Sequence, residues 1–315
     1  MQFADRLFRA VRQVGNPVLV GIDPRVEDLP KGFLDTFPAD RKGYAEAIGR
    51  FGIGVVDAVA GLVPAVKFQA AFYEMYGPQG YEALHATASH AKTRGLVVII
   101  DGKRNDIGST AEAYAKAYLG KVRVGDHLES PWPADALTVN PYLGSDGIDP
   151  FVKVAATENK GVFVLVRTSN PGAVDFQDLI ADGKPVYRHV AEHLNNWATG
   201  HHGLEGYSLV GAVAGATYPE QLAELRQLLP GIVFLVPGFG AQGGTAADVA
   251  AAFDENGLGA IVNSSRALTF AYKRPRFARF GDDWQGAIQA AVAEMAEDLA
   301  LNTTSGRLRD TNVTD

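Results

Sequence analysis

The chain has 315 residues, of which 47% are hydrophobic and 21% charged, and its formal net charge is −7. This composition is that of an ordinary globular protein, and charges spread along the chain exclude the basic footprint of a nucleic-acid-binding protein. Because the sequence contains no cysteine, it excludes a disulfide framework, a thiolate metal site and a cysteine nucleophile.

The amino-terminal segment lacks the apolar core of a signal peptide. No apolar run elsewhere approaches the length of a membrane span. We therefore expect a soluble, cytoplasmic protein that has neither a membrane nor a nucleic acid as its partner.

In chain order, apolar residues at helical spacing predict a helix over 3–14, and short apolar runs then predict strands over 18–23, 65–69 and about 96–103. Helices are expected between them, at about 43–60 and 77–93. The second half repeats this alternation, with strands over 136–140, 162–167, 208–213, 232–236 and 260–263, and helices at about 109–119, 184–199, 218–229 and 282–300.

Eight buried strands that alternate with helices are typical of a (β/α)8 TIM barrel, an α/β fold built as a single domain. We place this barrel at residues 1–300. The polar segment 301–315 is expected to be a disordered tail.

The third strand ends in residues 101–106, which read Asp-Gly-Lys-Arg-Asn-Asp. On an extended chain Asp101 and Lys103 point the same way, because they are two residues apart, and Asp106 lies just past the strand. Such charges are costly to remove from water. They form either a solvated ion pair worth ~0–1 kcal/mol or part of an active site, and a position at the carboxyl end of a barrel strand favours the active site. Ser109 to Glu112 matches a capping box for the next helix.

Polar residues also end the other predicted strands, and barrels carry their chemistry at these carboxyl ends. We therefore expect the polar side chains to gather at one rim. They are Asp23, Lys67, Asn140, Ser169 and Arg266, with the glycine-rich run 238–244.

Residues 238–243 read Gly-Phe-Gly-Ala-Gln-Gly, which matches the G-x-G-x-x-G pattern of dinucleotide-binding proteins. That function needs an acid at the end of the next strand, where this chain has Asn263. In barrels the loops after strands seven and eight often bind phosphate, and Arg266 supplies a bidentate donor there. A simple tight turn is the alternative; we favour a phosphate site. His189 and His193 do not form a metal-binding pattern, and we expect neither a metal nor a cofactor.

In these motifs the chain resembles the orotidine 5′-phosphate decarboxylase family, in its longer bacterial subfamily. The D-x-K-x-x-D signature lies at 101–106. The supporting matches are Gly-Ile-Asp-Pro at 21–24, Val-Lys-Phe at 66–68, Ser-Asn-Pro-Gly at 169–172, the run 237–244 and Ser-Ser-Arg at 264–266.

The resemblance implies a homodimeric enzyme that converts orotidine 5′-monophosphate to uridine 5′-monophosphate and carbon dioxide, the last step of pyrimidine nucleotide synthesis, without metal or cofactor. It implies that Lys103 protonates carbon C6. It also implies a charged network of Lys67, Asp101, Lys103 and Asp106, in which Asp106 comes from the partner subunit together with Ile107 and Thr110. It implies that Asp23 and Lys67 bind the ribose and that Ser169 contacts the pyrimidine. The phosphate would be bound by Arg266 and by Gln242 and Gly240 of the glycine-rich loop.

Three alternatives stay open. A 3-keto-L-gulonate 6-phosphate decarboxylase shares the barrel and the signature but holds magnesium with acids, one of them near the end of the second strand, where this chain has Lys67 to Gln69. A Schiff-base aldolase would use Lys67 or Lys103 as its nucleophile, which the flanking acids oppose. A barrel that binds nucleotides without catalysis would not need the full charged set.

Overall fold

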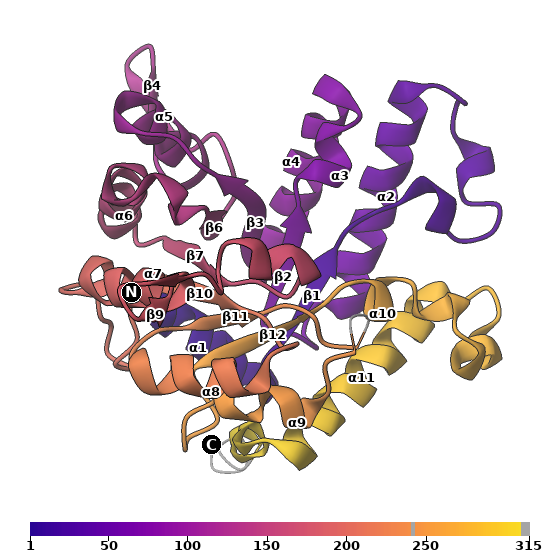
Figure 1. The fold of residues 1–315 in the computed structure, drawn as a ribbon. Coiled ribbons are helices and arrows are strands. Elements are labelled where there is room, and N and C mark those ends of the chain that lie inside the picture. Colours follow the sequence, from indigo (N-terminus) through magenta and orange to yellow (C-terminus); the bar gives the residue numbers. More distant parts are fainter. Residues whose placement is uncertain (241–242, 310–315) are drawn as a thin grey trace.

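The computed structural model describes residues 1–240 and 243–309. Eight parallel strands close into a barrel in the order β1-β12-β11-β10-β7-β6-β3-β2, with helices around it (Figure 1). The predicted single-domain (β/α)8 barrel is confirmed. The barrel strands are β1 (Val18–Ile22), β2 (Ala65–Gln69), β3 (Val97–Arg104), β6 (Ala136–Val139), β7 (Gly161–Arg167), β10 (Val210–Ala214), β11 (Phe234–Val236) and β12 (Ala260–Ser264).

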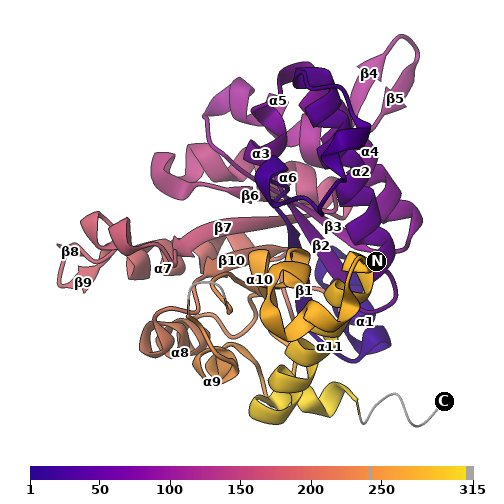
Figure 2. The same ribbon diagram turned by 90° about the vertical axis from the view of Figure 1, so that its right-hand side faces the viewer.

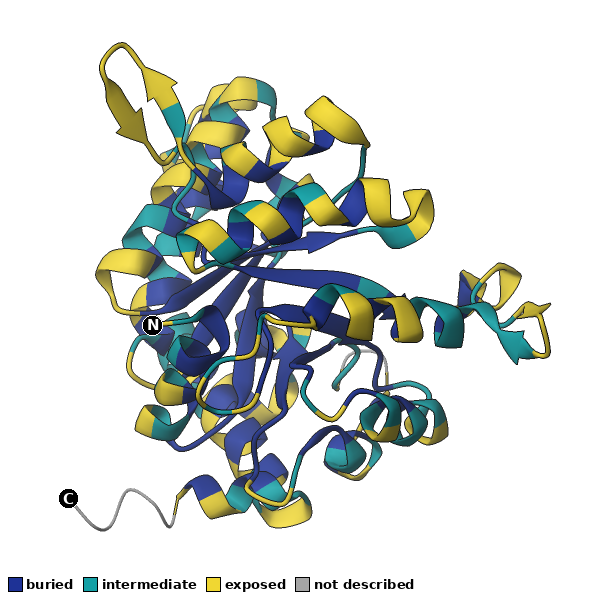
Figure 3. Ribbon diagram, turned by 90° about the vertical axis from the view of Figure 1, so that its left-hand side faces the viewer, coloured by how far each residue is buried: buried dark blue, intermediate teal, exposed yellow. Residues whose placement is uncertain are grey.

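The barrel strands are buried along most of their length, whereas the helices expose their outer faces (Figure 3). Burial on both faces explains why the strands read as continuous apolar runs rather than as alternating ones. The helices are α1 (Phe3–Val14), α2 (Arg41–Val59), α3 (Ala71–Glu74), α4 (Gly77–Thr93), α5 (Gly108–Leu119), α6 (Ser145–Glu158), α7 (Val186–Ala198), α8 (Pro219–Leu228), α9 (Ala246–Val249), α10 (Arg266–Thr269) and α11 (Trp284–Asn302).

Helix α1 lies across the amino-terminal ends of neighbouring strands. Phe3 packs on Gly161, the first residue of β7, where an added Cβ would come within 2.4 Å of the ring. Arg6 donates to the carboxylate of Asp135, just before β6. The helix therefore covers the amino-terminal end of the barrel and leaves the carboxyl end for the site.

Asp135 is fully buried at this amino-terminal end of the barrel. Its carboxylate accepts hydrogen bonds from Lys92 Nζ at 2.7 and 2.9 Å and from the Val98 amide at 2.9 Å. Burial works to raise the pKa of Asp135, but the charge of Lys92 and these hydrogen bonds outweigh it, so the pKa lies below its ordinary value. A depressed carboxyl pKa stabilises the fold above the unfolded pKa of about 4, and this stabilisation is lost as the pH falls through the folded value.

We expect Asp135→Asn to lower the free energy of unfolding at pH 7 by about 2–3 kcal/mol, because bonds to a buried charge are lost. Urea denaturation checks this, and the gap to the natural chain should narrow below about pH 4. Asp57→Asn is the control, since Asp57 pairs with His90 and Arg94 at the surface and should contribute under about 1 kcal/mol. A gap that does not change with pH would contradict the assignment.

Several elements differ from the expectation. Helix α6 was not predicted. Gly144 precedes it and Pro150 lies inside it, and both residues are more typical of a loop than of a helix. Two hairpins, β4 (Val122–Val124) with β5 (His127–Glu129) and β8 (Ile180–Ala181) with β9 (Lys184–Pro185), project from the barrel (Figure 2).

The carboxyl-terminal boundary also differs. Helix α11 continues past residue 300 to Asn302, and a 3₁₀ helix follows over Thr304–Leu308 with the Leu308 side chain buried. The expectation of a disordered tail is thus wrong for residues 301–309, because Leu308 is an apolar residue that packs in the core. Residues 310–315 lie outside the described part of the chain.

Candidate active site

A cavity of about 460 Å³ opens at the carboxyl ends of the barrel strands. Side chains from nearly every strand end converge there, as the sequence predicted for one polar rim. The predicted site residues that line it are Asp23, Lys67, Asp101, Lys103, Ser169 and Arg266, with Gly238 and Phe239 of the glycine-rich run. Asn140, which also ends a strand, is not among the lining residues.

Asp101 is the centre of the charged cluster, and its side chain is only 11% exposed. One carboxylate oxygen, Oδ2, accepts from Lys67 Nζ at 2.9 Å and from Gln69 Nε2 at 3.0 Å. The other, Oδ1, accepts from Lys103 Nζ at 2.7 Å and from Thr138 Oγ1 at 2.8 Å. Four donors on two oxygens give this buried charge a full set of partners, so the side chain is held in one orientation.

Burial works to raise the pKa of Asp101, but the positive charges of Lys67 and Lys103 outweigh it and hold the pKa well below its ordinary value. For Lys67 burial works to lower the pKa, and the charges of Asp101 and Asp23 outweigh it, so the pKa is raised. At neutral pH the site therefore holds an ionised carboxylate and a buried ammonium. Lys67 Nζ lies between the two acids, 3.9 Å from Asp23 Oδ1.

Lys103 differs from Lys67 in its surroundings. Its side chain is 45% exposed, and its Nζ donates one hydrogen bond, to Asp101. An ammonium carries three N–H donors, so two remain for a ligand in the cavity. The prediction that Lys103 and Asp101 face the same space is confirmed by this contact. The chain is not extended there, however, because Lys103 has φ +44°.

Ser169 lies in the loop after β7 and packs directly on Gly215. A Cβ added to Gly215 would come within 3 Å of the Ser169 backbone and Cβ, so only glycine leaves room for this contact. Its loop is anchored by Arg167, which is 1% exposed. The Arg167 guanidinium donates to Asp178 Oδ2 at 3.1 Å, to Gln177 Oε1 at 3.3 Å and to Thr168 O at 3.1 Å. A buried cation thus fixes the segment that forms one wall of the cavity.

The glycine-rich run and α10 form the opposite side. Gly238 and Gly240 have φ of +104° and +74°, a region that side chains avoid. The Gly240 N–H donates to Gly244 O at 2.8 Å, so in this conformation it is used within the loop. Arg266 is exposed and begins α10, and none of the described residues bonds its guanidinium. Gln242, predicted to bind the phosphate, lies outside the described residues.

Asp106, Ile107 and Thr110 do not line the cavity of their own chain. Asp106 Oδ1 accepts from the Ile107 amide at 2.8 Å, and Ile107 is 52% exposed. Helix α5 begins at Gly108 after Ile107, without a side-chain cap, so the predicted capping box from Ser109 to Glu112 is wrong. Instead Glu112 pairs with Lys116, one turn further along the helix.

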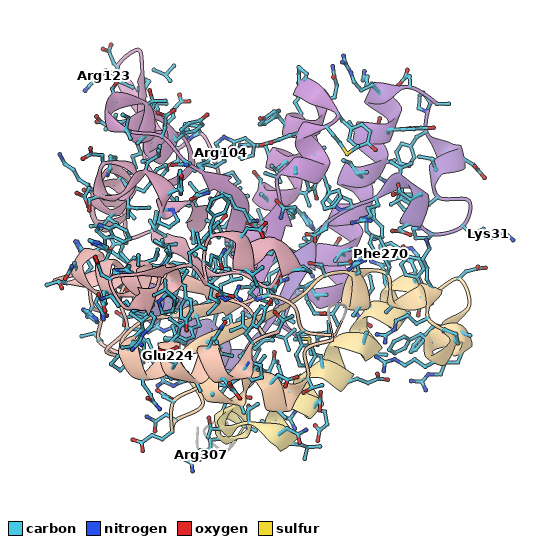
Figure 4. The ribbon with its side chains drawn as sticks, in the orientation of Figure 1. Lys31, Arg104, Arg123, Glu224, Phe270 and Arg307 are labelled. Carbon is cyan, nitrogen blue, oxygen red and sulfur yellow. The ribbon has the colours of Figure 1, made fainter. Side chains whose placement is uncertain are left out.

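Arg104, labelled in Figure 4, is the last residue of β3. It forms an ion pair with Glu74 of α3 and donates to the Tyr118 hydroxyl of α5 at 2.7 Å. This arginine therefore links α3 to α5.

Among residues 1–240 and 243–309, no three His, Cys, Asp or Glu side chains lie close enough together to hold a metal ion. None of the helices in these ranges combines the length and the apolarity that a membrane crossing requires.

Sequence reasoning missed several lining residues. Gln69 lies two residues after Lys67, so strand alternation alone places both on the same side. Thr138 is the second-last residue of β6, so its place near the carboxyl end of a strand is a similar signal for the cavity. Asn263 was considered only as a position that lacks an acid, and Ser265 only as part of the Ser-Ser-Arg match. Arg167, which anchors one wall without lining the cavity, had no signal in the sequence, because its partners come from the loop after it and from α8, where Gln221 accepts from its Nε at 2.7 Å.

Comparisons of the sequence and of the structure with known proteins all lead to one enzyme family. The family model described as "Orotidine 5′-phosphate decarboxylase / HUMPS family" matches residues 48–279. A Rhodopirellula baltica protein named orotidine 5′-phosphate decarboxylase is 53% identical over 302 residues, which cover 95% of this chain and 99% of the relative. A protein of the same name from Caldicellulosiruptor bescii is 44% identical and covers 87% and 91%. The structure of Leishmania donovani OMP decarboxylase superposes with a TM-score of 0.73 at 30% identity, covering 96% of this chain and 99% of that one.

Proposed function

The chain belongs to the orotidine 5′-phosphate decarboxylase / HUMPS family of enzymes, and from this premise we propose that it converts orotidine 5′-monophosphate to uridine 5′-monophosphate and carbon dioxide. The observation that carries the proposal is the Lys67–Asp101–Lys103 cluster, a fixed carboxylate between two ammonium groups at the cavity wall. Arg266, which lines the same cavity, supplies a positive charge for the phosphate.

Loss of carbon dioxide leaves an electron pair at C6 in the plane of the pyrimidine ring, where the π system cannot accept it. The Lys103 ammonium stabilises this carbanion and then transfers one proton from Nζ to C6. The neutral amine regains a proton from solvent, to which the side chain is open. Asp101 holds the Lys103 ammonium in place through the hydrogen bond that Nζ donates to Oδ1 at 2.7 Å.

Magnitudes show that Lys103 does not act alone. One ion contact at ~4 Å contributes about 4 kcal/mol at an effective dielectric near 20, whereas enzymes commonly lower barriers by ~8–23 kcal/mol. Binding of the remote phosphate supplies further energy for alignment. In this proposal Asp23 and Lys67 hold the ribose, Ser169 meets the pyrimidine, and Arg266 with Gln242 and the loop around Gly240 takes the phosphate.

We also propose that the active enzyme is a homodimer. Asp106, Ile107 and Thr110 belong to the implied site but do not line the cavity of their own chain. A partner subunit would bring them to it. The exposed Ile107 side chain supports a contact of this kind.

The magnesium-dependent decarboxylation of 3-keto-L-gulonate 6-phosphate is disfavoured by the charged cluster itself. The ammonium of Lys67 occupies the space between Asp23 and Asp101 in which a cation would otherwise lie. A Schiff-base role for Lys67 is disfavoured by its raised pKa, since a nucleophilic amine must be neutral.

The proposal is tested by following the ultraviolet absorbance of orotidine 5′-monophosphate with the purified protein and a chelator. We expect the orotate chromophore to disappear at an unchanged rate when the chelator is present. Turnover of 3-keto-L-gulonate 6-phosphate with magnesium, and no loss of the orotate chromophore, would contradict it.

Arg266→Ala tests the phosphate site. We expect KM for the monophosphate to rise about 100-fold or more, because a bidentate charged contact is lost, while turnover of the nucleoside orotidine changes less than about threefold. Steady-state kinetics with both substrates checks this. Equal losses for both substrates would show that Arg266 does not bind the phosphate.

A further inference from the structure

The pairing of β3 with β6 is interrupted at the catalytic cluster. Ile100 pairs with Leu137 and the next register pair is Arg104 with Val139. Residues 101–103 of β3 therefore stand opposite a single residue of β6, Thr138. This is a β-bulge, a feature that redirects side chains next to active sites.

The bulge contains an unfavourable backbone conformation. Lys103 has φ +44°, a region that costs a residue with a Cβ roughly 1–2 kcal/mol. Such a conformation persists only when surrounding contacts hold it. Here the conformation directs Lys103 Nζ back to Asp101, whereas Arg104, the next residue, leaves toward α3 and α5.

Thr138 supplies the contacts that hold the bulge, and its side chain is almost fully buried. The Lys103 amide donates to Thr138 Oγ1 at 2.9 Å, and the same hydroxyl donates to Asp101 Oδ1 at 2.8 Å. Because an amide only donates and a carboxylate only accepts, the direction of both bonds is fixed. One hydroxyl thus joins the backbone of the lysine to the carboxylate that its own side chain contacts.

We propose that Thr138 is a positioning residue, which fixes the relative placement of Asp101 and Lys103 through its hydroxyl. The proposal rests on the proposed function, in which Lys103 Nζ must meet C6. Without the hydroxyl, Asp101 Oδ1 loses one of its two donors and the Lys103 amide loses its acceptor. Asp101 can then rotate toward Lys67 and Gln69, and Lys103 loses its fixed direction.

The test compares Thr138→Val, which keeps the branched shape, with Thr138→Ser, which keeps the hydroxyl. In Thr138→Val we expect kcat for orotidine 5′-monophosphate to fall about 10- to 100-fold, the equivalent of bonds to a charged group. KM and the dissociation constant of uridine 5′-monophosphate should change less than about threefold, because the hydroxyl does not line the ribose or phosphate contacts. Thr138→Ser should keep kcat within about fivefold of the natural chain.

Thr87→Val is the matched control, since Thr87 is also a fully buried threonine, but its hydroxyl donates to the Ala83 carbonyl within α4. We expect this variant to leave kcat unchanged even if it lowers the melting temperature. A fall in kcat that follows melting temperature across all three variants would overturn the proposal. So would a kcat for Thr138→Val within threefold of the natural value.

Hydrogen exchange of the Lys103 amide gives a readout that needs no turnover. We expect this amide to exchange at least about tenfold faster in Thr138→Val than in the natural chain or Thr138→Ser, since only the valine removes its acceptor. If the natural protein does not decarboxylate orotidine 5′-monophosphate, the proposed function fails, and the exchange rate still decides whether Thr138 holds the bulge. Unchanged exchange in Thr138→Val would overturn that role.

Discussion

Replacing Lys103 with alanine should lower kcat for orotidine 5′-monophosphate by at least about 10³-fold. The Lys103 ammonium has two N–H donors that no described residue uses, and it is placed by Asp101 at 2.7 Å. The variant loses both a charge contact of about 4 kcal/mol and the proton donor for C6, and each 1.36 kcal/mol corresponds to a factor of ten in rate.

The measurement is steady-state turnover followed by orotate absorbance, together with the affinity for uridine 5′-monophosphate. Binding should weaken far less than turnover, because the ribose and phosphate contacts remain. Lys42→Ala, which removes an exposed lysine of α2, is the control and should retain full turnover. Near-normal turnover in Lys103→Ala would exclude this lysine as the proton donor.

Replacing Asp106 with alanine is expected to lower turnover at least about 100-fold, the scale on which one electrostatic contact at the reacting centre acts. The expected loss is large although Asp106 does not line the cavity of its own chain, because we propose that it completes the site of the partner subunit. Steady-state turnover of the variant, measured at several protein concentrations, checks the size of this loss.

Complementation separates this role from a local one. In a two-fold dimer, pairing one Lys103→Ala chain with one Asp106→Ala chain leaves one site with both residues intact and one with neither. The heterodimer, purified with two different affinity tags, should therefore recover roughly half of the natural turnover per dimer. A heterodimer as inactive as its parents would show that Asp106 acts within its own chain.

The fold follows closely from hydrophobic pattern, because each barrel strand is buried on both faces and reads as a short apolar run. The predicted strand over 65–69 coincides with β2, and the predicted helix over 3–14 coincides with α1. Helix α6 escaped prediction because Gly144, Gly147 and Pro150 are turn-forming residues, and only packing against its neighbours overrides that local preference.

The charged part of the site was predictable for a related reason, since side chains at the carboxyl ends of parallel strands converge. Asp101, Lys103 and Lys67 meet as expected. The contribution of Thr138 was not readable, because it depends on a bulge that shifts the register of β3 against β6. Local pattern also misled at Ser109, where a capping motif is present in sequence but unused in the helix.

The most direct test of Lys103 as the partner of a C6 carbanion is exchange of the C6 proton of uridine 5′-monophosphate in D2O, followed by proton nuclear magnetic resonance. This reaction forms the same carbanion without decarboxylation. We predict that the natural enzyme incorporates deuterium at C6 and that Lys103→Ala, saturated with the same nucleotide, exchanges at least about 10³-fold more slowly. Equal exchange rates in the two proteins would contradict the central role of Lys103.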